Sequence, residues 1–190
     1  GTLCESEALL NFINQATKTT KVLVDEAYLE YTDQPSLANL VTENKNLIIA
    51  KTFSKIYGLA GSRIGYAIAH PDTINEISQL QFSTNGSVSV VSASGALASL
   101  KDDKFVKETI LLNAAASKYT IEQLENLKIP CIPSHTNFVY FSLENYNKDF
   151  FEQLKKNSIL GTKIYEEKGK WSRITIGTMT EMKQFIKALV

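Results

Sequence analysis

The sequence is poor in the residues that build disulfide frameworks and metal clusters. Its 190 residues include two cysteines, Cys4 and Cys131, and two histidines, His70 and His135, and neither pair has the spacing of a metal-binding motif. A small disulfide-rich secreted fold is excluded, because such a fold needs several cysteine pairs. We expect these cysteines and histidines to have structural roles, and we predict a reducing, cytoplasmic compartment.

The sequence also lacks an excess of charge and any long apolar run. Lys and Arg together number 20, as do Asp and Glu, whereas proteins that bind duplex nucleic acid or membranes usually carry a basic excess. The longest apolar runs, such as residues 47–50, fall far short of the roughly 18 residues that a membrane helix needs. The first residues do not show a basic region followed by an apolar core, which marks a signal peptide. We therefore expect neither a nucleic acid nor a membrane as a partner.

The first hundred residues show the pattern of an α/β fold. The composition is that of an ordinary globular protein, with 44% hydrophobic and 21% charged residues. Short apolar runs rich in β-branched residues predict buried strands at residues 21–26, 46–51 and 63–69, the first of them parallel. One helix is expected after Ser6, which would cap it, and another over residues 72–80.

The last ninety residues alternate between helix and strand. Apolar residues at near-helical spacing predict a long helix over residues 102–127. The elements expected after it are strands at 137–141 and 173–176 and helices at 149–156 and 180–189. We therefore predict two domains, an α/β part over residues 1–100 and a smaller α+β unit over residues 101–190.

Three polar clusters lie at the ends of the predicted strands. They are Asp25, Glu26 and Tyr28 after the first strand, Thr52, Ser54 and Lys55 after the second, and Ser172 with Arg173 near the C-terminus. Open α/β sheets bind ligands at the carboxyl ends of their strands. Asp25 and Lys55 therefore lie at the same edge of the sheet if their two strands are neighbours.

These side chains are the ones that a pyridoxal-phosphate site needs. A lysine amine forms a Schiff base with the aldehyde of this cofactor. A carboxylate keeps the pyridine nitrogen protonated, so that the ring accepts electrons, and a phenol bonds to the ring oxygen O3′. Hydroxyl groups and an arginine bind the phosphate dianion. The clusters therefore predict pyridoxal 5′-phosphate as the cofactor.

Longer motifs around these clusters resemble a known family. The motifs are VDEAY at 24–28, TFSKIYGLAGSRIGY at 52–66 and SRITIGT at 172–178. They resemble the fold type I pyridoxal-phosphate enzymes of aminotransferase class I and II, and among these the histidinol-phosphate aminotransferases. The resemblance extends over essentially the whole chain, and the central motif is specific because it is long and ordered. It implies a partial large domain over residues 1–100 and the small C-terminal domain over residues 101–190.

The resemblance implies a role for each cluster residue. Lys55 matches the Schiff-base lysine and the catalytic acid and base, Asp25 matches the partner of the pyridine nitrogen, and Tyr28 matches the partner of O3′. The matches to the phosphate contacts are Thr52, Ser54 and Arg63.

Other residues near the motifs are weighed between the site and the fold. Gly58 and Gly61 are expected to serve the backbone of the turn. Core packing explains Tyr31, Tyr57 and Asn85 as well as a place in the site does.

The substrate contacts implied by the resemblance lie near the C-terminus. Arg173 matches the arginine that holds the anionic group of the substrate, which is the phosphate in histidinol-phosphate aminotransferases. Many of those enzymes carry a second arginine earlier in the chain, where this sequence has Thr162 or Lys163. Lys163 is the second candidate, although lysine meets a phosphate without the bidentate geometry of arginine. This departure leaves the amino donor open.

The implied activity is transfer of an amino group from a small-molecule donor to a 2-oxo acid. Histidinol phosphate and 2-oxoglutarate would give imidazole acetol phosphate and glutamate. Because the cofactor contacts are shared, an aromatic or broad amino-acid aminotransferase and a phosphothreonine decarboxylase remain as alternatives. The resemblance also implies a homodimer.

The start of the chain also bears on function. It begins at Gly1 without a methionine, and Gly1 and Thr2 match the end of the N-P-T-G-T segment of the family. We expect a C-terminal fragment without the N-terminal half, which holds the aromatic residue that stacks on the cofactor and a phosphate loop. Such a fragment is expected to bind the cofactor weakly or not at all, and a second hypothesis is a folded unit with no activity of its own.

Overall fold

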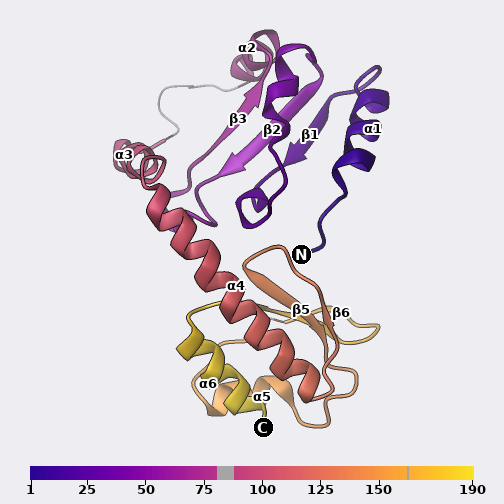
Figure 1. Ribbon diagram of the computed structural model, residues 1–190, viewed down its shortest axis with the longest axis vertical. Coiled ribbons are helices and arrows are strands. Elements are labelled where there is room, and N and C mark those ends of the chain that lie inside the picture. The colour runs from indigo at the N-terminus through magenta and orange to yellow at the C-terminus, as the bar shows by residue number, and fades with distance from the viewer. Residues whose placement is uncertain (81–87, 162) are drawn as a thin grey trace. The chain divides into compact units, whose positions relative to one another are not determined.

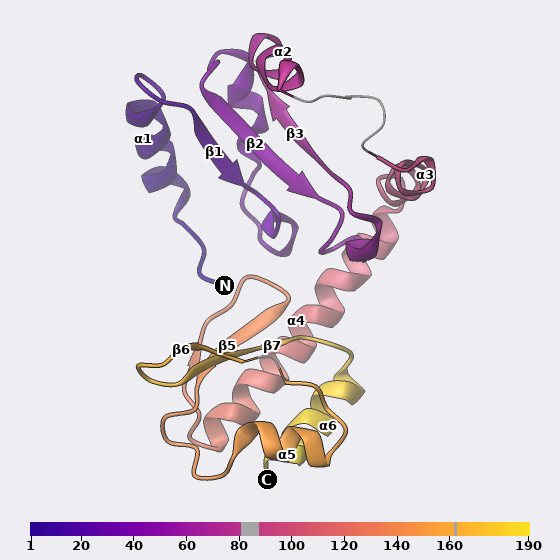
Figure 2. The ribbon, with the colours of Figure 1, turned by 180° about the vertical axis from the view of Figure 1, so that it is seen from behind.

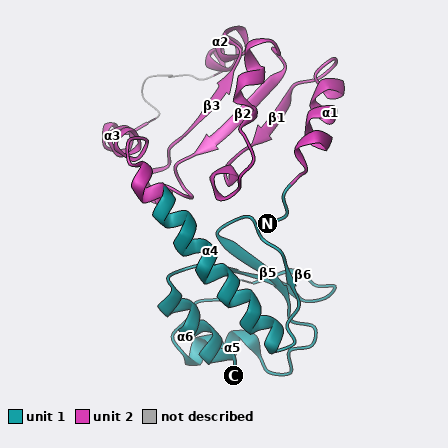
Figure 3. Ribbon diagram, in the orientation of Figure 1, with its two compact units in different colours: residues 1–3, 107–190 teal, residues 4–106 magenta. Residues whose placement is uncertain are grey.

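The protein divides into two compact units, which are coloured separately in Figure 3. The computed structural model describes residues 1–80, 88–161 and 163–190. The N-terminal unit is Cys4–Val106, and the C-terminal unit combines Gly1–Leu3 with Lys107–Val190. Asn85 and Thr162, two of the residues weighed above, lie outside the described residues.

A three-stranded sheet forms the centre of the N-terminal unit (Figure 1). Its strands are β1 (Val22–Asp25), β2 (Leu47–Thr52) and β3 (Gly65–Ala69), in that spatial order. β1 and β2 are parallel, whereas β3 runs antiparallel to β2. All three strands were predicted from the sequence, and the parallel direction of the first is confirmed.

Only one face of this sheet is covered by apolar side chains of the described residues. The core comprises Ile13 of α1 (Ser6–Ala16), Val41 of the 3-10 helix η2 (Leu37–Thr42), and Val22, Leu47 and Ile49 of the sheet. On the other face Leu23 is 62% exposed, and Gly65 and Ala67 of β3 are exposed too. The prediction that these strands are fully buried is therefore wrong, because no layer of the described residues covers their second face.

The helices of the N-terminal unit begin with different caps from those expected. Glu5, rather than Ser6, occupies the N-cap of α1, and the Ser6 hydroxyl instead donates a hydrogen bond to Gln34. α2 (Pro71–Gln79) begins with proline, and the Nδ1 atom of His70 accepts a hydrogen bond of 3.2 Å from the Asp72 amide. His70 thus has the structural role expected of it. The small-residue helix α3 (Val90–Ser99) completes the unit.

The C-terminal unit is an antiparallel sheet packed on helices. The sheet has the order β4 (Cys131–Ile132), β5 (Phe138–Ser142), β7 (Trp171–Thr175), β6 (Ile164–Glu166). Its helices are α5 (Phe150–Lys156), α6 (Met179–Leu189) and, from Lys107 onwards, α4 (Asp103–Asn126). The long helix, the two longer strands and the last two helices were predicted. The short strands β4 and β6 were not, because two or three residues carry too little periodicity to recognise.

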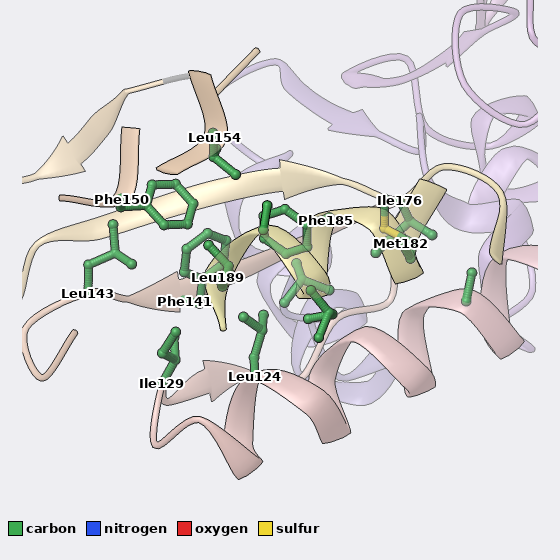
Figure 4. Packing of buried hydrophobic residues seen from close by; sticks show 14 residues of the cluster. Leu124, Ile129, Phe141, Leu143, Phe150, Leu154, Ile176, Met182, Phe185 and Leu189 are labelled. Atoms are coloured by element: carbon green, nitrogen blue, oxygen red, sulfur yellow. The ribbon is translucent and has the colours of Figure 1, made fainter. Parts of the chain in front are cut away.

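The core of the C-terminal unit lies between this sheet and its helices, as Figure 4 shows. Val139 and Phe141 of β5 are both 0% exposed and point to the helices, since alternate strand residues share a face. Leu124 of α4 and Phe185 of α6 pack against them. Two of the helices begin with side-chain caps, Asp149 for α5 and a full capping box at Thr178 for α6.

None of the helices in the described part of the chain is long and apolar enough to cross a membrane. The buried surface of each unit instead comes from amphipathic helices and half-covered sheets.

The loop after β1 carries a tyrosine in an unusual electrostatic environment. Tyr31 ends the 3-10 helix η1 (Leu29–Tyr31), and its ring centroid lies 6.3 Å from that of Tyr28. Burial, together with the neighbouring Tyr28 and Glu30, raises the pKa of Tyr31 to about 12. Each of these influences disfavours the negatively charged phenolate.

Truncation of a core leucine should weaken the C-terminal unit strongly. Leu124→Ala, at a site that is 0% exposed, should lower the free energy of unfolding by roughly 2–5 kcal/mol, because it removes buried methyl groups and leaves a cavity. Leu112→Ala, on the same helix but at a site 72% exposed, should change it by less than about 0.5 kcal/mol. Urea denaturation measures both values, and equal losses would contradict the assignment of the core.

Tyr31 should make the protein less stable at alkaline pH. Because its pKa is raised from 10.0 to about 12, the folded protein holds this proton more tightly than the unfolded chain. The stability that Tyr31 contributes is complete below pH 10 and is lost as the pH rises towards 12. The free energy of unfolding of the wild type should therefore fall more steeply over this interval than that of Tyr31→Phe, which cannot ionise. Equal slopes would show that Tyr31 titrates normally.

Candidate active site

The parallel pairing of β1 and β2 brings two of the polar clusters to one edge of the sheet (Figure 2). Asp25, the last residue of β1, is in register with Ala50, two residues before the end of β2. The two strands are neighbours, which is the condition under which the sequence analysis placed Asp25 and Lys55 at one edge. Asp25 is exposed, and its Oδ1 atom accepts a hydrogen bond of 3.0 Å from the amide of Ala27. This contact leaves the other carboxylate oxygen available to a ligand.

Lys55 and Tyr28 meet at this edge. Tyr28 follows β1 and Lys55 follows β2, and the lysine Nζ atom lies 4.9 Å from the centroid of the tyrosine ring. A cation at this distance from an aromatic face is attracted by the negative charge of the π system. The structure therefore brings a primary amine, a phenol and the end of the Asp25 strand into one region of the N-terminal unit.

Two buried side chains anchor the segment that carries Lys55. Phe53 and Ile56 are 3% and 1% exposed, so they hold the backbone against the core while Ser54 and Lys55 remain partly exposed. The Thr52 Oγ1 atom accepts a hydrogen bond of 3.1 Å from the Ser54 amide. The Thr52 side chain thus shapes this bend, and its hydroxyl proton stays available as a donor.

In the turn that follows, the backbone favours glycine at Gly58 but not at Gly61, and Arg63 is exposed. Gly58 has a φ of +68°, which favours glycine, whereas Gly61 has no positive φ and a Cβ there would meet nothing within 4 Å. The expectation for Gly61 is therefore wrong. The left-handed conformation falls instead on Arg63, with a φ of 49°, and its Nη1 atom donates a hydrogen bond of 2.9 Å to the Ala60 carbonyl. Arg63 is exposed and retains further N–H donors for an anion.

A buried group of charges lies behind this edge, and sequence reasoning missed it. The Nζ atom of Lys51 lies 3.1 Å from Oε2 of Glu26 and 3.0 Å from Oε1 of Glu30. Burial alone would lower the pKa of Lys51, but the hydrogen bonds and charges of Glu30 and Glu26 outweigh it and raise that pKa. The sequence signal was a lysine directly after the apolar residues 47–50, with acidic residues after the neighbouring strand.

The sequence left open whether Tyr57 belongs to the site or to the core. In the structure its ring packs against a buried phenylalanine. Its ring centroid lies 5.0 Å from that of buried Phe53. Burial and the charge of Glu30 raise the pKa of Tyr57.

The candidate substrate contacts lie in the C-terminal unit and share an aromatic ring. The Arg173 guanidinium carbon lies 4.7 Å from the centroid of Phe138 and 5.3 Å from that of Tyr165, on the sheet face opposite the core. The Nζ atom of Lys163 lies 5.2 Å from the same Tyr165 centroid. Both cations therefore contact the ring of Tyr165, whose role was not recognised from the sequence. A strand of three residues gave no pattern that placed it.

Comparison with known proteins identifies the family. The family model described as aminotransferase class I and II matches residues 1–189. A histidinol-phosphate aminotransferase of Moorella thermoacetica is 34% identical over 194 residues, which cover 100% of this chain and 50% of that protein. The chain thus spans about half the length of this relative.

Solved structures show the same fold. The crystal structure of histidinol-phosphate aminotransferase from Sinorhizobium meliloti in complex with pyridoxal-5′-phosphate matches with a TM-score of 0.88 and 27% identity, over 100% of this chain and 53% of that one. The L-threonine-O-3-phosphate decarboxylase of Porphyromonas gingivalis matches with a TM-score of 0.80 and 24% identity, over 100% of this chain and 59% of that one. The mixed α/β architecture predicted from the sequence is confirmed, and the chain belongs to the aminotransferase class I and II family.

Proposed function

We propose that the complete natural protein is a pyridoxal-phosphate-dependent aminotransferase that acts on histidinol phosphate. In this proposal the N-terminal unit is part of the large cofactor domain and the C-terminal unit is the small domain. The observation that carries the proposal is the meeting of Lys55 and Tyr28 beside Asp25, at the carboxyl ends of two parallel strands. Sequence identity of 34% to a histidinol-phosphate aminotransferase supports it.

The residues of the N-terminal unit fit the cofactor chemically. Lys55 offers the primary amine, Asp25 an exposed carboxylate with a free oxygen, and Tyr28 a phenol. The hydroxyls of Thr52 and Ser54 and the exposed guanidinium of Arg63 are donors for a phosphate group. The donor set therefore matches the aldehyde, ring nitrogen, ring oxygen and phosphate of pyridoxal phosphate.

The residues act at defined atoms. When bound, pyridoxal phosphate supplies an aldehyde that bonds to primary amines and a ring that withdraws electrons. Lys55 would bond through its Nζ atom to the aldehyde until the amine of the donor displaces it, and the freed lysine amine would then take the α-proton of the donor and return it as an acid. The Asp25 carboxylate would keep the ring nitrogen protonated. Tyr28 would donate a hydrogen bond to the ring oxygen O3′, and Arg63 would orient the phosphate group with charge-assisted hydrogen bonds.

Arg173 and Lys163 recognise the anionic group of the amino donor. One arginine rarely neutralises a phosphate dianion alone, and both side chains contact the ring of Tyr165. The rings of Phe138 and Tyr165 hold the Arg173 guanidinium by cation–π contacts, so less side-chain entropy is lost on binding. This pair of cations supports histidinol phosphate as the donor and a 2-oxo acid such as 2-oxoglutarate as the acceptor.

A phosphothreonine decarboxylase is the second candidate. The fold of the Porphyromonas gingivalis enzyme supports it, and so does the pair of cations, since its substrate also carries a phosphate. Release of carbon dioxide without a 2-oxo acid separates this candidate from an aminotransferase. A homodimer, which rests on the family resemblance, and a cytoplasmic location, which rests on the scarcity of cysteine, are further parts of our proposal.

Replacement of Lys55 should abolish turnover. In the complete natural protein, Lys55→Ala should lower the rate of amino transfer by on the order of a thousandfold or more, because one side chain provides both the nucleophile and the proton carrier. Lys45→Ala, at an exposed lysine of the same unit, should keep the wild-type rate. Borohydride reduction followed by peptide mapping locates the lysine bound to the cofactor, and a label on another lysine would overturn the assignment.

The two cations should affect different kinetic constants. Lys163→Ala should raise the KM for histidinol phosphate by about tenfold with little change in kcat, because it removes one of two contacts to the phosphate. Arg173→Ala should remove activity with every anionic donor, whereas Lys168→Ala, at an exposed lysine of the hairpin between β6 and β7, should have no effect. A preference for phenylalanine or tyrosine together with a silent Lys163→Ala would point to a broad amino-acid aminotransferase.

A further inference from the structure

The charges buried behind the candidate site have no part in the proposed chemistry. The side chains of Glu26, Lys51 and Glu30 are only 4%, 12% and 21% exposed. Burial of charged groups is costly unless they are paired. These paired charges are largely removed from water, unlike an ion pair on the surface, so we expect them to have a structural role.

The Lys51 ammonium joins the two segments that carry the candidate cofactor residues. Glu26 directly follows Asp25, and Glu30 comes two residues after Tyr28. Lys51 itself lies near the end of β2, four residues before Lys55. The two carboxylates therefore reach the same Nζ atom from the loop after β1, while the lysine holds them to the end of β2.

Lys51 lies on the wrong face of the sheet to touch a ligand at Asp25. Alternate residues of a strand share a face, so Lys51 is on the buried face with Leu47 and Ile49. Glu26 is on that same buried face, whereas Asp25 points to the other one. Lys51 therefore does not touch the cofactor, and its ion pairs position the cofactor residues through the backbone that carries them.

Hydrogen bonds of Glu26 also connect the end of β1 to β2 and to residues 36 and 37, further along the loop. The Glu26 amide donates a hydrogen bond of 2.9 Å to the Ala50 carbonyl, which continues the pairing of β1 and β2 beyond Asp25. Its carboxylate accepts bonds of 2.7 Å from the Ser36 hydroxyl and 2.8 Å from the Leu37 amide. Without Lys51, the like charges of Glu26 and Glu30 would repel each other, and no ion pair would hold this loop to the end of β2.

We propose that Lys51 is a positioning residue that fixes the loop carrying Asp25 and Tyr28 relative to the segment carrying Lys55. This inference rests on the proposed function, because it concerns the residues assigned to the cofactor. Lys51 sets their spacing from the buried face of the sheet, without touching the cofactor or the substrate.

The test compares variants of the complete natural protein by three measurements. These are the dissociation constant of pyridoxal phosphate, the pH midpoint of the absorption change of the bound cofactor, and the unfolding temperature of the cofactor-free protein. Lys51→Met removes the charge and Lys51→Arg keeps it. Lys21→Met removes a lysine from an exposed ion pair with Glu76 in the same unit and serves as the matched control.

Lys51→Met should weaken cofactor binding by about tenfold or more, which is a loss of about 1.4 kcal/mol, and should also move the absorption midpoint. Lys51→Arg should restore both values, and Lys21→Met should leave them unchanged. Glu30→Gln, a milder change at the more exposed carboxylate, should shift both values in the same direction as Lys51→Met, and it covers the case in which that variant does not fold.

Two results would overturn the inference in different ways. A lower unfolding temperature in Lys51→Met and Glu30→Gln, with unchanged binding and an unchanged midpoint, would mean that the charges only stabilise the fold. A wild-type protein that loses pyridoxal phosphate on dialysis would overturn the proposed function itself and the inference with it.

Discussion

The parallel pairing of β1 with β2 is the constraint on which the candidate site depends. Two parallel neighbours end at the same edge of a sheet, so the residues that follow them are brought together although they are distant in the sequence. The register of Asp25 with Ala50 places the carboxylate near the end of β2, and the chain then needs only a short anchored turn to place Lys55 against Tyr28. Any change in this register would move both side chains.

Because alternate strand residues point to opposite faces, the candidate site residues and the buried residues lie on different faces of each sheet. On β1 and β2 the buried face holds apolar residues and the charges of Glu26 and Lys51, and the other face holds Asp25. The sheet of the C-terminal unit follows the same rule, with Phe141 in the core and Arg173 on the opposite face. In both units a candidate ligand-binding residue lies on a strand whose opposite face packs in the interior of the unit.

Much of the fold and of the candidate site could be predicted because the signals are local. Apolar runs marked the longer strands, helical periodicity marked α4, and the long motif around Lys55 marked the candidate cofactor residues. The missed features depend on contacts between distant segments. The exposure of β3 depends on which layers cover the sheet, and the ion pairs of Lys51 join residues more than twenty positions apart, at Glu26 and Glu30. Local periodicity carries no information about such partners.

In our proposal the edge formed by β1 and β2 holds pyridoxal phosphate with its ring nitrogen at Asp25. The ¹⁵N chemical shift of cofactor labelled at the ring nitrogen, bound to the complete natural protein at mildly alkaline pH, reports directly on this contact. We expect a protonated nitrogen in the wild type and an unprotonated one in Asp25→Asn, because an amide cannot stabilise the positive ring nitrogen. The same shift in both proteins would show that Asp25 does not face the ring and would contradict the assignment of this edge.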